Sequence, residues 1–324
     1  MKKEDVILSL GNDWARLKEL LDSSLCSDVP LLNDINASLL LNGGKMLRPM
    51  LTLFFAKLCG GSPLPEESIQ AAASVELLHN ATLLHDDVAD NAATRRGNPT
   101  VLSQYGAVPA VLVGDFWLAR AVGLLVHSSH LYWMVDICSR TLIDLAEGEM
   151  LQQQKAFSSD TTSEDYLRII YGKTASLFET ACKMGAVSVS ADEAIVAAAG
   201  TYGNALGMAF QIRDDILDYT GGEEIGKPVG IDLLEQKITL PLLGALENSG
   251  DDGSIRKMIH SIPEHPEYCA EIRKFVIDNG GVEYAENMVG RYVSDAVSAL
   301  GAFAPSKDRE ILEYLALSSA NREK

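Results

Sequence analysis

Cysteine is scarce in this 324-residue chain, and its few copies lie far apart. No two of them have the spacing of a metal-binding pair, and their odd number does not suggest a disulfide framework. We therefore expect reduced thiols in a cytoplasmic protein. The five residues are Cys26, Cys59, Cys138, Cys182 and Cys269.

Basic residues are also few: 27 lysines and arginines stand against 45 aspartates and glutamates, a formal net charge of −18. Such a surface repels the phosphate backbone of nucleic acids, so broad nucleic-acid binding is excluded. A site for an anionic ligand on this chain must gather its few cations locally.

An uninterrupted apolar run long enough to cross a membrane is missing. The stretch 107–126 is broken by Pro109, Asp115 and Arg120. The stretch 194–210 lacks charges, but it holds three glycines and an asparagine and is short for a span. Acidic residues among the first 13 do not suit a signal peptide. We predict a soluble chain without a membrane span.

What the sequence does have is apolar residues at helical spacing, from one end to the other. No alternating run bounded by turn signals indicates a strand, so we predict an all-α fold. Ser163, followed by Glu164 and Asp165, is the expected N-cap of one helix. The predicted helices cover 35–41, 47–58, 69–85, 108–126, 139–154, 163–185, 192–219 and 237–247.

Loop signals fall between these helices, at 60–63, 95–99, 220–224 and 248–253. None of them is a long flexible linker. Helices that are apolar on several faces, without a linker, imply one large bundle in which some helices are central. We therefore predict a single domain over 1–324, in which 1–30 form a peripheral N-terminal segment.

The pattern Asp-Asp-x-x-Asp occurs twice, and each copy follows a strongly apolar run. In a helix, positions three and four apart share a face, so each triplet stacks its carboxylates along one side. Like charges at this spacing cost about 0.2–0.5 kcal/mol per pair. The triplets are Asp86, Asp87 and Asp90, and Asp214, Asp215 and Asp218.

One such triplet alone would be an ordinary acidic surface patch, but two of identical spacing indicate a metal site. Magnesium binds through a few carboxylates, several waters and the phosphates of a substrate. The six aspartates are therefore predicted to hold divalent cations that in turn hold a diphosphate.

Cationic residues near the turn signals are candidates for direct contact with diphosphate. Arginine binds phosphate oxygens in pairs, whereas lysine acts as a point charge. Each of these residues alone has an ordinary explanation as a surface charge or, for His79, as a core histidine. Their occurrence together with the triplets favours a role in binding for Lys45, Arg48, His79, Arg95, Arg96, Lys173 with Thr174, Lys227 and Lys237.

With these residues in place, the chain resembles the trans-type polyprenyl-diphosphate synthases over about 32–315. The landmarks are Gly-Gly-Lys-x-x-Arg-Pro at 43–49, ELLHNATLLHDDVADNAATRRG at 76–97, Gly114-Asp115, Gly172-Lys173-Thr174, Phe210-Gln211-x-x-Asp214-Asp215-x-x-Asp218, and Gly226-Lys227-Pro228 with Thr239-Leu240-Pro241.

The resemblance implies an all-α bundle around a deep central cavity, a homodimer, and two triplets that face each other and hold the allylic diphosphate through three Mg²⁺ ions. It assigns Lys173, Thr174, Gln211 and Lys227 to catalysis. Together with Arg95 and Lys237 they would contact the allylic diphosphate. Isopentenyl diphosphate would be held by Gly44, Lys45, Arg48, His79 and Arg96.

Two positions depart from the family pattern. Met46 stands where the family often has arginine, and Gln236 where it often has glycine. The second departure puts the role of Lys237 in doubt.

Product length is predicted from the residues one turn below the first triplet. Ala81 and Thr82 are small, whereas short-chain relatives typically carry an aromatic near these positions. Of the two, Thr82 lies better on the helix face of Asp86. We therefore predict a long, octaprenyl-like product of six to ten isoprene units. A tunnel floor elsewhere, for example along 110–126, is the alternative.

Other functions fit less well. A terpene cyclase of the same fold would replace one triplet by an Asn/Ser/Glu metal motif and would need no isopentenyl site. Glu76-x-x-His79 resembles half of a carboxylate-bridged di-iron site, but a second such pair is missing. Non-catalytic partner subunits commonly lose a triplet, and this chain keeps both. A short-chain synthase and the catalytic half of a two-subunit enzyme stay open.

Overall fold

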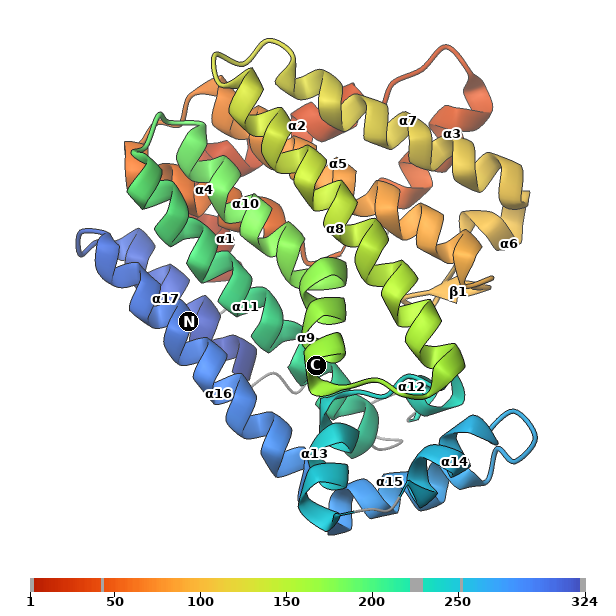
Figure 1. The fold of residues 1–324 in the computed structure, drawn as a ribbon. Coiled ribbons are helices and arrows are strands. Elements are labelled where there is room, and N and C mark those ends of the chain that lie inside the picture. Colours follow the sequence, from red (N-terminus) through yellow and green to blue (C-terminus); the bar gives the residue numbers. More distant parts are fainter. Residues whose placement is uncertain (1–2, 42–43, 222–229, 251–252, 321–324) are drawn as a thin grey trace. The chain divides into compact units, whose positions relative to one another are not determined.

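The computed structural model describes residues 3–41, 44–221, 230–250 and 253–320. Almost all of these form helices, which confirms the all-α prediction (Figure 1). Two compact units can be distinguished: residues 1–138, 180–199 and 303–311 in unit 1, and 139–179, 200–302 and 312–324 in unit 2. The prediction of a single domain is not tested by this division and stays a prediction.

Unit 1 is built around the long helix α5 (Glu66–Ala89), which packs against α2 (Asn12–Ser24), α4 (Leu47–Gly60) and α7 (Ala107–Leu125) (Figure 1). The segment 71–73 of α5 consists of buried alanines, which let the neighbouring helices approach closely. On α7, Gly114 lies against the imidazole of His85 on α5, and a Cβ at this position would displace that ring. Ser74 Oγ also donates to the Ala121 carbonyl at 2.8 Å.

The remaining elements of unit 1 surround these helices. A short antiparallel hairpin pairs Thr94 with Pro99 and Arg95 with Asn98, within the predicted loop 95–99. The elements are α1 (Lys3–Leu10), α3 (Pro30–Leu41), β1 (Thr94–Arg95), β2 (Asn98–Pro99), α6 (Val101–Tyr105), and parts of α8 (Leu131–Ser158), α10 (Ser176–Val187), α11 (Glu193–Thr220) and α17 (Lys307–Ala320).

Unit 2 has a separate apolar core, to which the second half of α11 contributes Ile212, Ile216 and Tyr219. Burying a side chain of this size stabilises the fold by about 1.5–3 kcal/mol. Helix α13 (Leu240–Ser249) packs against α15 (Tyr268–Asp278) and α16 (Gly281–Ala299). The further elements are α9 (Ser163–Ile170), η1 (Tyr171–Ala175), α12 (Ile231–Leu234), α13 (Leu240–Ser249), α14 (Ser254–His260), α15 (Tyr268–Asp278), α16 (Gly281–Ala299) and η3 (Leu300–Ala302).

Several sequence-based helix boundaries are wrong. The helices expected from 35 and 139 begin earlier, at Pro30 and Leu131. The N-cap of α9 is Thr162 and not Ser163, because Asp165 at the third helical position completes a capping box with Thr162. The helix expected from 237 begins at Leu240, after the extended residue Thr239 and with Pro241 in its first turn. Lys237 therefore lies before the helix. The predicted loop 220–224 lies mostly outside the described residues.

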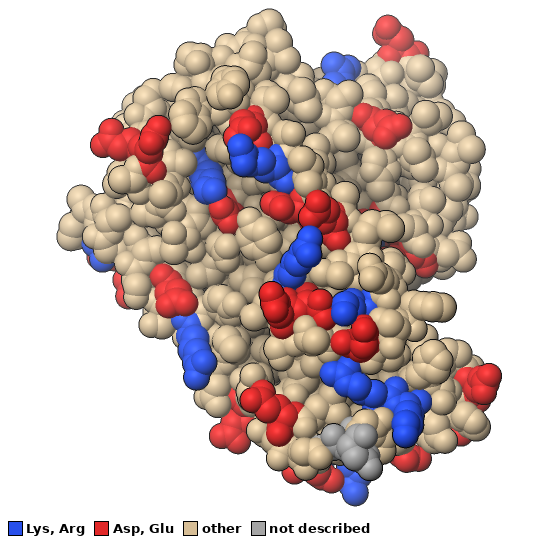
Figure 2. All heavy atoms as spheres, viewed as in Figure 1, with Lys and Arg blue, Asp and Glu red and all other residues tan. Residues whose placement is uncertain are grey.

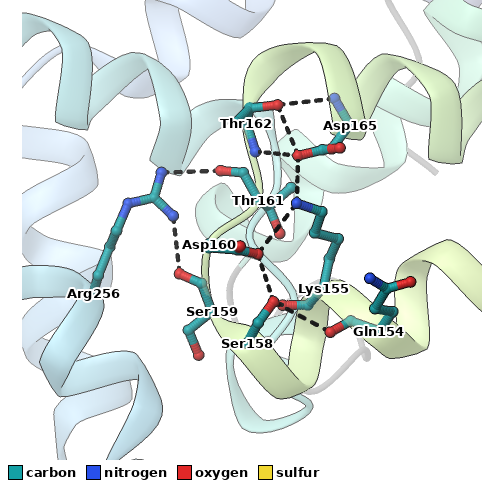
Figure 3. Close-up of polar contacts among 9 residues, drawn as sticks. All are labelled: Gln154, Lys155, Ser158, Ser159, Asp160, Thr161, Thr162, Asp165 and Arg256. Atoms are coloured by element: carbon teal, nitrogen blue, oxygen red, sulfur yellow. Dashed lines mark hydrogen bonds and ion pairs between the residues drawn. The ribbon is translucent and has the colours of Figure 1, made fainter.

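The turn between α8 and α9 is held by charged side chains (Figure 3). Arg256 donates to the carbonyls of Ser159 and Thr161, both at 2.9 Å. Lys155, near the end of α8, pairs with Asp160 at 3.2 Å and with Asp165 at 2.9 Å. These contacts fix the direction in which the chain enters α9.

Candidate active site

The first aspartate triplet ends α5, with Asp86 and Asp87 in the last turn and Asp90 as the C-cap. The end of a helix carries partial negative charge, so carboxylates placed there need cations nearby. Arg95 supplies one: its Nε donates to Asp87 Oδ1 at 2.6 Å, and Asp87 is 5% exposed. The contact of Arg95 with an allylic diphosphate stays a prediction.

Four of the five residues predicted to bind isopentenyl diphosphate come together in unit 1. The guanidinium of Arg96 lies against Gly44, where a Cβ would displace it. Arg48 Nη1 lies 3.0 Å from His79 Nε2. Arg96 also acts electrostatically on both Arg48 and His79. The fifth residue, Lys45, is exposed and follows Gly44 directly in the chain.

The contact between Arg48 and His79 determines the protonation state of the imidazole. A guanidinium only donates hydrogen bonds, so His79 Nε2 must accept, and the ring proton sits on Nδ1. Burial, and next the charge of Arg48, hold the pKa of His79 well below its usual range. Burial lowers the pKa of Arg48 to about 10, so it stays charged at neutral pH. His79 is thus neutral and carries its ring proton on Nδ1.

The second triplet lies near the end of α11 in unit 2, and its central member is held from two sides. Asp215 is 4% exposed. Its Oδ2 accepts from the Tyr166 hydroxyl at 2.7 Å, and its Oδ1 accepts from Gln211 Nε2 at 2.8 Å. Burial, and next the charge of Asp232, raise the pKa of Asp215 well above its usual range. A bound cation would offset this cost.

Asp218, the last member, is oriented by the backbone of the following segment. Its carboxylate accepts from the amides of Ile231 and Asp232, both at 3.2 Å. Burial raises the pKa of Asp218, although these backbone donors oppose the rise. The beginning of α12 is thereby attached to the triplet.

Lys173 and Thr174 lie on η1, a π-helical turn within the helical run from α9 to α10. Thr174 Oγ1 donates to Gln211 Oε1 at 2.6 Å, and Lys173 Nζ pairs with Glu149 at 2.7 Å. A Cβ at Gly172 would clash with the Asp144 carbonyl on α8. Glycine therefore lets this turn lie close enough to α8 for Lys173 to reach Glu149.

A cavity of about 200 Å³ joins these groups in unit 2. Lys173, Gln211, Asp215 and Lys237 all line it, so the structure brings together four residues that the sequence assigned to the allylic diphosphate and its metals. Lys237 pairs with Glu235, which the sequence had not indicated. Lys227 lies outside the described residues.

The two predicted chain-length residues differ in their surroundings. Ala81 is 1% exposed and belongs to the core of unit 1. Thr82 is half-buried, and its hydroxyl donates to the His79 carbonyl at 2.8 Å. Of the two, Thr82 has the more accessible side chain.

The residues of the triplets fit magnesium by their chemistry, because all six offer the carboxylate oxygens that this ion prefers. Within the described ranges, no three histidine, cysteine or acidic side chains already converge on one point as a metal site. The triplets belong to different units, so their approach across a shared cavity stays a prediction.

Sequence reasoning missed three side chains of the cavity or its border: Tyr166, which binds Asp215, Glu149, which binds Lys173, and Asp232. Burial, and next the charge of Asp218, raise the pKa of Asp232 to about 6. Asp232 lies between the motifs Gly226-Lys227-Pro228 and Thr239-Leu240-Pro241, five residues before Lys237. This position could have identified it as a candidate site residue. Tyr166 and Glu149 carry no such local signal.

The visible face of the molecule mixes charges of both signs and shows no large basic field (Figure 2). Several predicted ligand-binding cations already sit beside a carboxylate, as Arg95, Lys173 and Lys237 do. This arrangement keeps these cations ordered on a strongly acidic chain.

Helix α7 is the one described helix whose length and apolar composition would suit a membrane span, with a mean hydropathy of 1.6. One helix of this kind is a weak indication, because core helices of soluble proteins have the same composition. Pro109, Asp115 and Arg120 all lie within it.

Comparison with known proteins agrees with the motifs. The family model described as Polyprenyl synthetase matches residues 29–276. The chain is 36% identical over 326 residues to an all-trans-nonaprenyl-diphosphate synthase (geranyl-diphosphate specific) of Rhodobacter capsulatus, covering 99% of this chain and 98% of that protein.

Solved structures extend the likeness to the fold. A decaprenyl diphosphate synthase from Rhodobacter capsulatus superposes with a TM-score of 0.92 at 34% identity, with both chains fully covered. A polyprenyl synthase from Caulobacter crescentus CB15, complexed with calcium and isoprenyl diphosphate, gives 0.90 at 35% identity and covers 100% of this chain and 98% of that one.

The fold that the chain shares with these neighbours is the all-α isoprenoid synthase fold. Within this class, the chain belongs to the polyprenyl synthetase family, as the sequence motifs predicted.

Proposed function

We propose that the chain is a magnesium-dependent trans-prenyltransferase that adds isopentenyl diphosphate repeatedly, head to tail, to an allylic diphosphate and makes a long-chain polyprenyl diphosphate. One observation carries the proposal: each aspartate triplet has cationic side chains of its own within the same unit. Arg95 contacts Asp87 in unit 1, and Lys173 lines the cavity of Asp215 in unit 2. Both sets serve the allylic diphosphate in this proposal, and the second diphosphate has separate cations, Arg48 and Arg96, around His79.

In this proposal, Lys173, Thr174 and Gln211, together with Lys227, hold the diphosphate that leaves the allylic substrate. Magnesium held by the six aspartates, in three ions by resemblance, would stabilise the negative charge that develops on that leaving group. Arg48, Arg96, Lys45 and the Nδ1–H of His79 hold the second diphosphate, with the backbone of Gly44 beside them.

Cleavage of the allylic C–O bond leaves a carbocation, and the apolar walls must shield it from water. The π electrons of isopentenyl diphosphate form the new C–C bond and leave a cation on the other carbon of the former double bond. A proton is then lost from the carbon next to this cation, and its C–H electrons form the new double bond. The described ligand-binding side chains include no evident general base, so the released diphosphate accepts this proton. The lengthened product is again an allylic diphosphate and is the substrate for the next addition.

We also propose that the chain acts as a homodimer in the cytoplasm. Exposed apolar residues follow one another on α7 and the start of α8, which supports an interface between copies: Val108, Leu112, Val122, Val126, Tyr132 and Trp133. Exposed apolar side chains typically mark an interface where they form a patch. None of the five cysteines is in a disulfide, which a reducing compartment would favour.

The test uses the purified chain alone, with an allylic diphosphate, radiolabelled isopentenyl diphosphate and magnesium. We expect incorporation into products longer than farnesyl diphosphate, lost on adding EDTA and restored by excess magnesium. Absence of incorporation would contradict the proposed activity. A farnesyl-sized product would indicate a short-chain synthase, and activity only after addition of a second protein would indicate a two-component enzyme.

A further inference from the structure

Lys173 on the π-helical turn η1 is held by a carboxylate to which the proposed reaction gives no role. Glu149 Oε2, on α8, lies 2.7 Å from Lys173 Nζ. Both side chains are half-buried, and both residues belong to unit 2. The ion pair therefore lies in the same unit as the second aspartate triplet.

The ion pair follows from a close contact between two glycines. Gly148 and Gly172 come directly before Glu149 and Lys173 in the chain, and both glycines are buried. A Cβ built on Gly148 would lie 3.0 Å from the Gly172 Cα and 2.9 Å from the Lys173 amide nitrogen. Helix α8 and the turn η1 thus touch backbone to backbone, and this contact brings the residue after each glycine close to the other element.

The carboxylate of Glu149 is itself oriented by the next turn of α8. Its Oε1 accepts from Gln152 Nε2 and from Gln153 Nε2, each at 3.1 Å. Burial alone would raise the pKa of Glu149, but the charge and the hydrogen bond of Lys173, with the hydrogen bond of Gln153, outweigh it and lower the pKa. Glu149 is therefore ionised at neutral pH and carries the charge that an ion pair with Lys173 requires.

The carboxylate is not part of the wall of the cavity in unit 2. Lys173 lines this cavity beside Gln211 and Asp215, whereas Glu149 is not among the described side chains that line it. Thr174, the next residue of η1, donates to Gln211 Oε1 on α11 at 2.6 Å. The two side chains of this turn that the proposed function assigns to the diphosphate are thus each held by another helix.

A lysine that is already ordered binds an anion with a smaller loss of entropy than a mobile one. Its ammonium group sits on a flexible four-carbon stem and carries three N–H donors. One donor is enough for a bond to Glu149, so the others can reach phosphate oxygens. Ordering the stem before the ligand arrives strengthens binding, because less freedom is lost in the binding step.

We propose that Glu149 is a positioning residue for the allylic diphosphate: its carboxylate holds Lys173 at the wall of the cavity, in the arrangement that receives the phosphate oxygens. This inference rests on the proposed function. Glu149 touches no substrate in it and acts through Lys173.

The test is Glu149→Gln, which keeps the length of the side chain and removes its charge. We expect the KM for farnesyl diphosphate, used as the allylic substrate, to rise about three- to tenfold, the effect of a lysine that is ordered only on binding. The KM for isopentenyl diphosphate should change less than about twofold, because its proposed ligands Arg48 and His79 belong to unit 1. Glu149→Asp keeps the charge on a shorter side chain and should recover part of the loss.

A double-mutant cycle tests whether Glu149 acts through Lys173. Lys173→Met removes the ammonium group, and adding Glu149→Gln to this variant should raise the KM for farnesyl diphosphate no further. A second increase of the same size in the double variant would mean that Glu149 acts by another route, and it would overturn the inference.

The direction of the change separates the remaining explanations. If Glu149 acted mainly by repelling the diphosphate, Glu149→Gln would lower the KM for farnesyl diphosphate. If it were only structural, the melting temperature would fall and neither KM would change. Either outcome overturns the inference. Calorimetric titration of the folded variants with farnesyl diphosphate and magnesium, without isopentenyl diphosphate, measures the same loss without turnover.

Glu147→Gln is the matched control, because Glu147 lies two residues earlier on α8 and pairs with the exposed Arg168 at 3.2 Å. Both KM values should stay within about twofold of the wild-type values in this variant, since exposed ion pairs contribute little. A wild-type protein without prenyl transfer would contradict the proposed function itself. An active wild type, with an unchanged KM for farnesyl diphosphate in Glu149→Gln, would contradict the positioning role alone.

Discussion

Thr174 and Gln211 are 37 residues apart in the chain, and the Thr174 hydroxyl donates to Gln211 Oε1 at 2.6 Å. Because the amide oxygen is used in this way, the amide nitrogen of Gln211 turns to Asp215, 2.8 Å away. One side chain therefore links the π-helical turn to the second aspartate triplet.

Replacing Gln211 by alanine removes both of these contacts. We expect Gln211→Ala to lower kcat by about 10- to 100-fold, the usual cost of losing a side chain that orients a metal-binding carboxylate. Steady-state rates at saturating substrates measure this. Gln154→Ala, at an exposed position on α8, is the control and should retain normal rates. A loss smaller than twofold in Gln211→Ala would contradict the positioning of Asp215 by this residue.

The pair of Lys155 and Asp165 predicts an acid-sensitive contribution to stability (Figure 3). Burial alone would raise the pKa of Asp165, but the hydrogen bonds from Lys155 and Thr162 outweigh it and lower the pKa from 3.8 to about 2. A carboxylate with a lowered folded-state pKa stabilises the fold above its ordinary pKa, and this stabilisation is lost as the pH falls through the folded-state value.

We therefore expect Asp165→Asn to cost about 0.5–1 kcal/mol of unfolding free energy above pH 4, and the difference from wild type to disappear as the pH falls towards 2. Urea unfolding at a series of pH values measures it. Lys155→Met should show the same loss, and the double variant should add little. A difference that is constant from pH 5 to pH 2 would argue against this ion pair.

Product length is predicted to respond to Thr82. Thr82→Phe places an aromatic ring at a half-buried position one turn before Asp86 and should shorten the longest product by at least one isoprene unit. Ala81→Phe is harder to interpret, because a larger side chain at this buried position costs about 1–3 kcal/mol of folding stability. Chain-length analysis of the radiolabelled products measures this effect. Unchanged product length in both variants would mean that the wall of the tunnel that limits product length lies elsewhere, for example along α7.

Self-association is predicted to depend on the apolar face of α7. Leu112 is 60% exposed, and a charge there would be buried in any interface formed by this face. Leu112→Glu should therefore shift a dimer towards monomer in sedimentation or light scattering. Leu8→Glu, on the 75% exposed Leu8 of α1, is the control and should leave the association unchanged. Identical masses for wild type and Leu112→Glu would rule out this surface.

Helical period was enough to predict the all-α class and the longer helices between about 30 and 250, whereas the family was predicted from the resemblance of the motifs and the helices α1, α2 and α14 to α17 were not predicted. The expected 47–58 and 192–219 correspond to α4 and α11 within about two residues. Boundaries failed where neighbouring residues had similar capping ability, as at Thr162 and Ser163, since the choice depended on which of them paired with Asp165. The family motifs also identified Gly44, Arg48, His79 and Arg96, which the structure gathers in one cluster.

Contacts between distant segments were beyond prediction from spacing. The bond from Tyr166 to Asp215 depends on how α9 lies against α11, and no local pattern marks it. Glu76 entered the sequence analysis only as half of a possible metal motif, because the charge of Arg48 that acts on it comes from another helix. The π-helical turn was missed because an apolar run of this length has the same appearance with or without one extra residue.

The extra residue of the π turn determines how the segment 171–175 responds to mutation. A π turn contains one residue more than an α turn, and each residue advances a helix by about 100°. Deleting one residue between 171 and 175 would leave a continuous helix, but it would rotate every later side chain of the run relative to α9. Substitutions in this turn are local events, whereas a single-codon deletion would misalign the whole segment and separate Thr174 from Gln211.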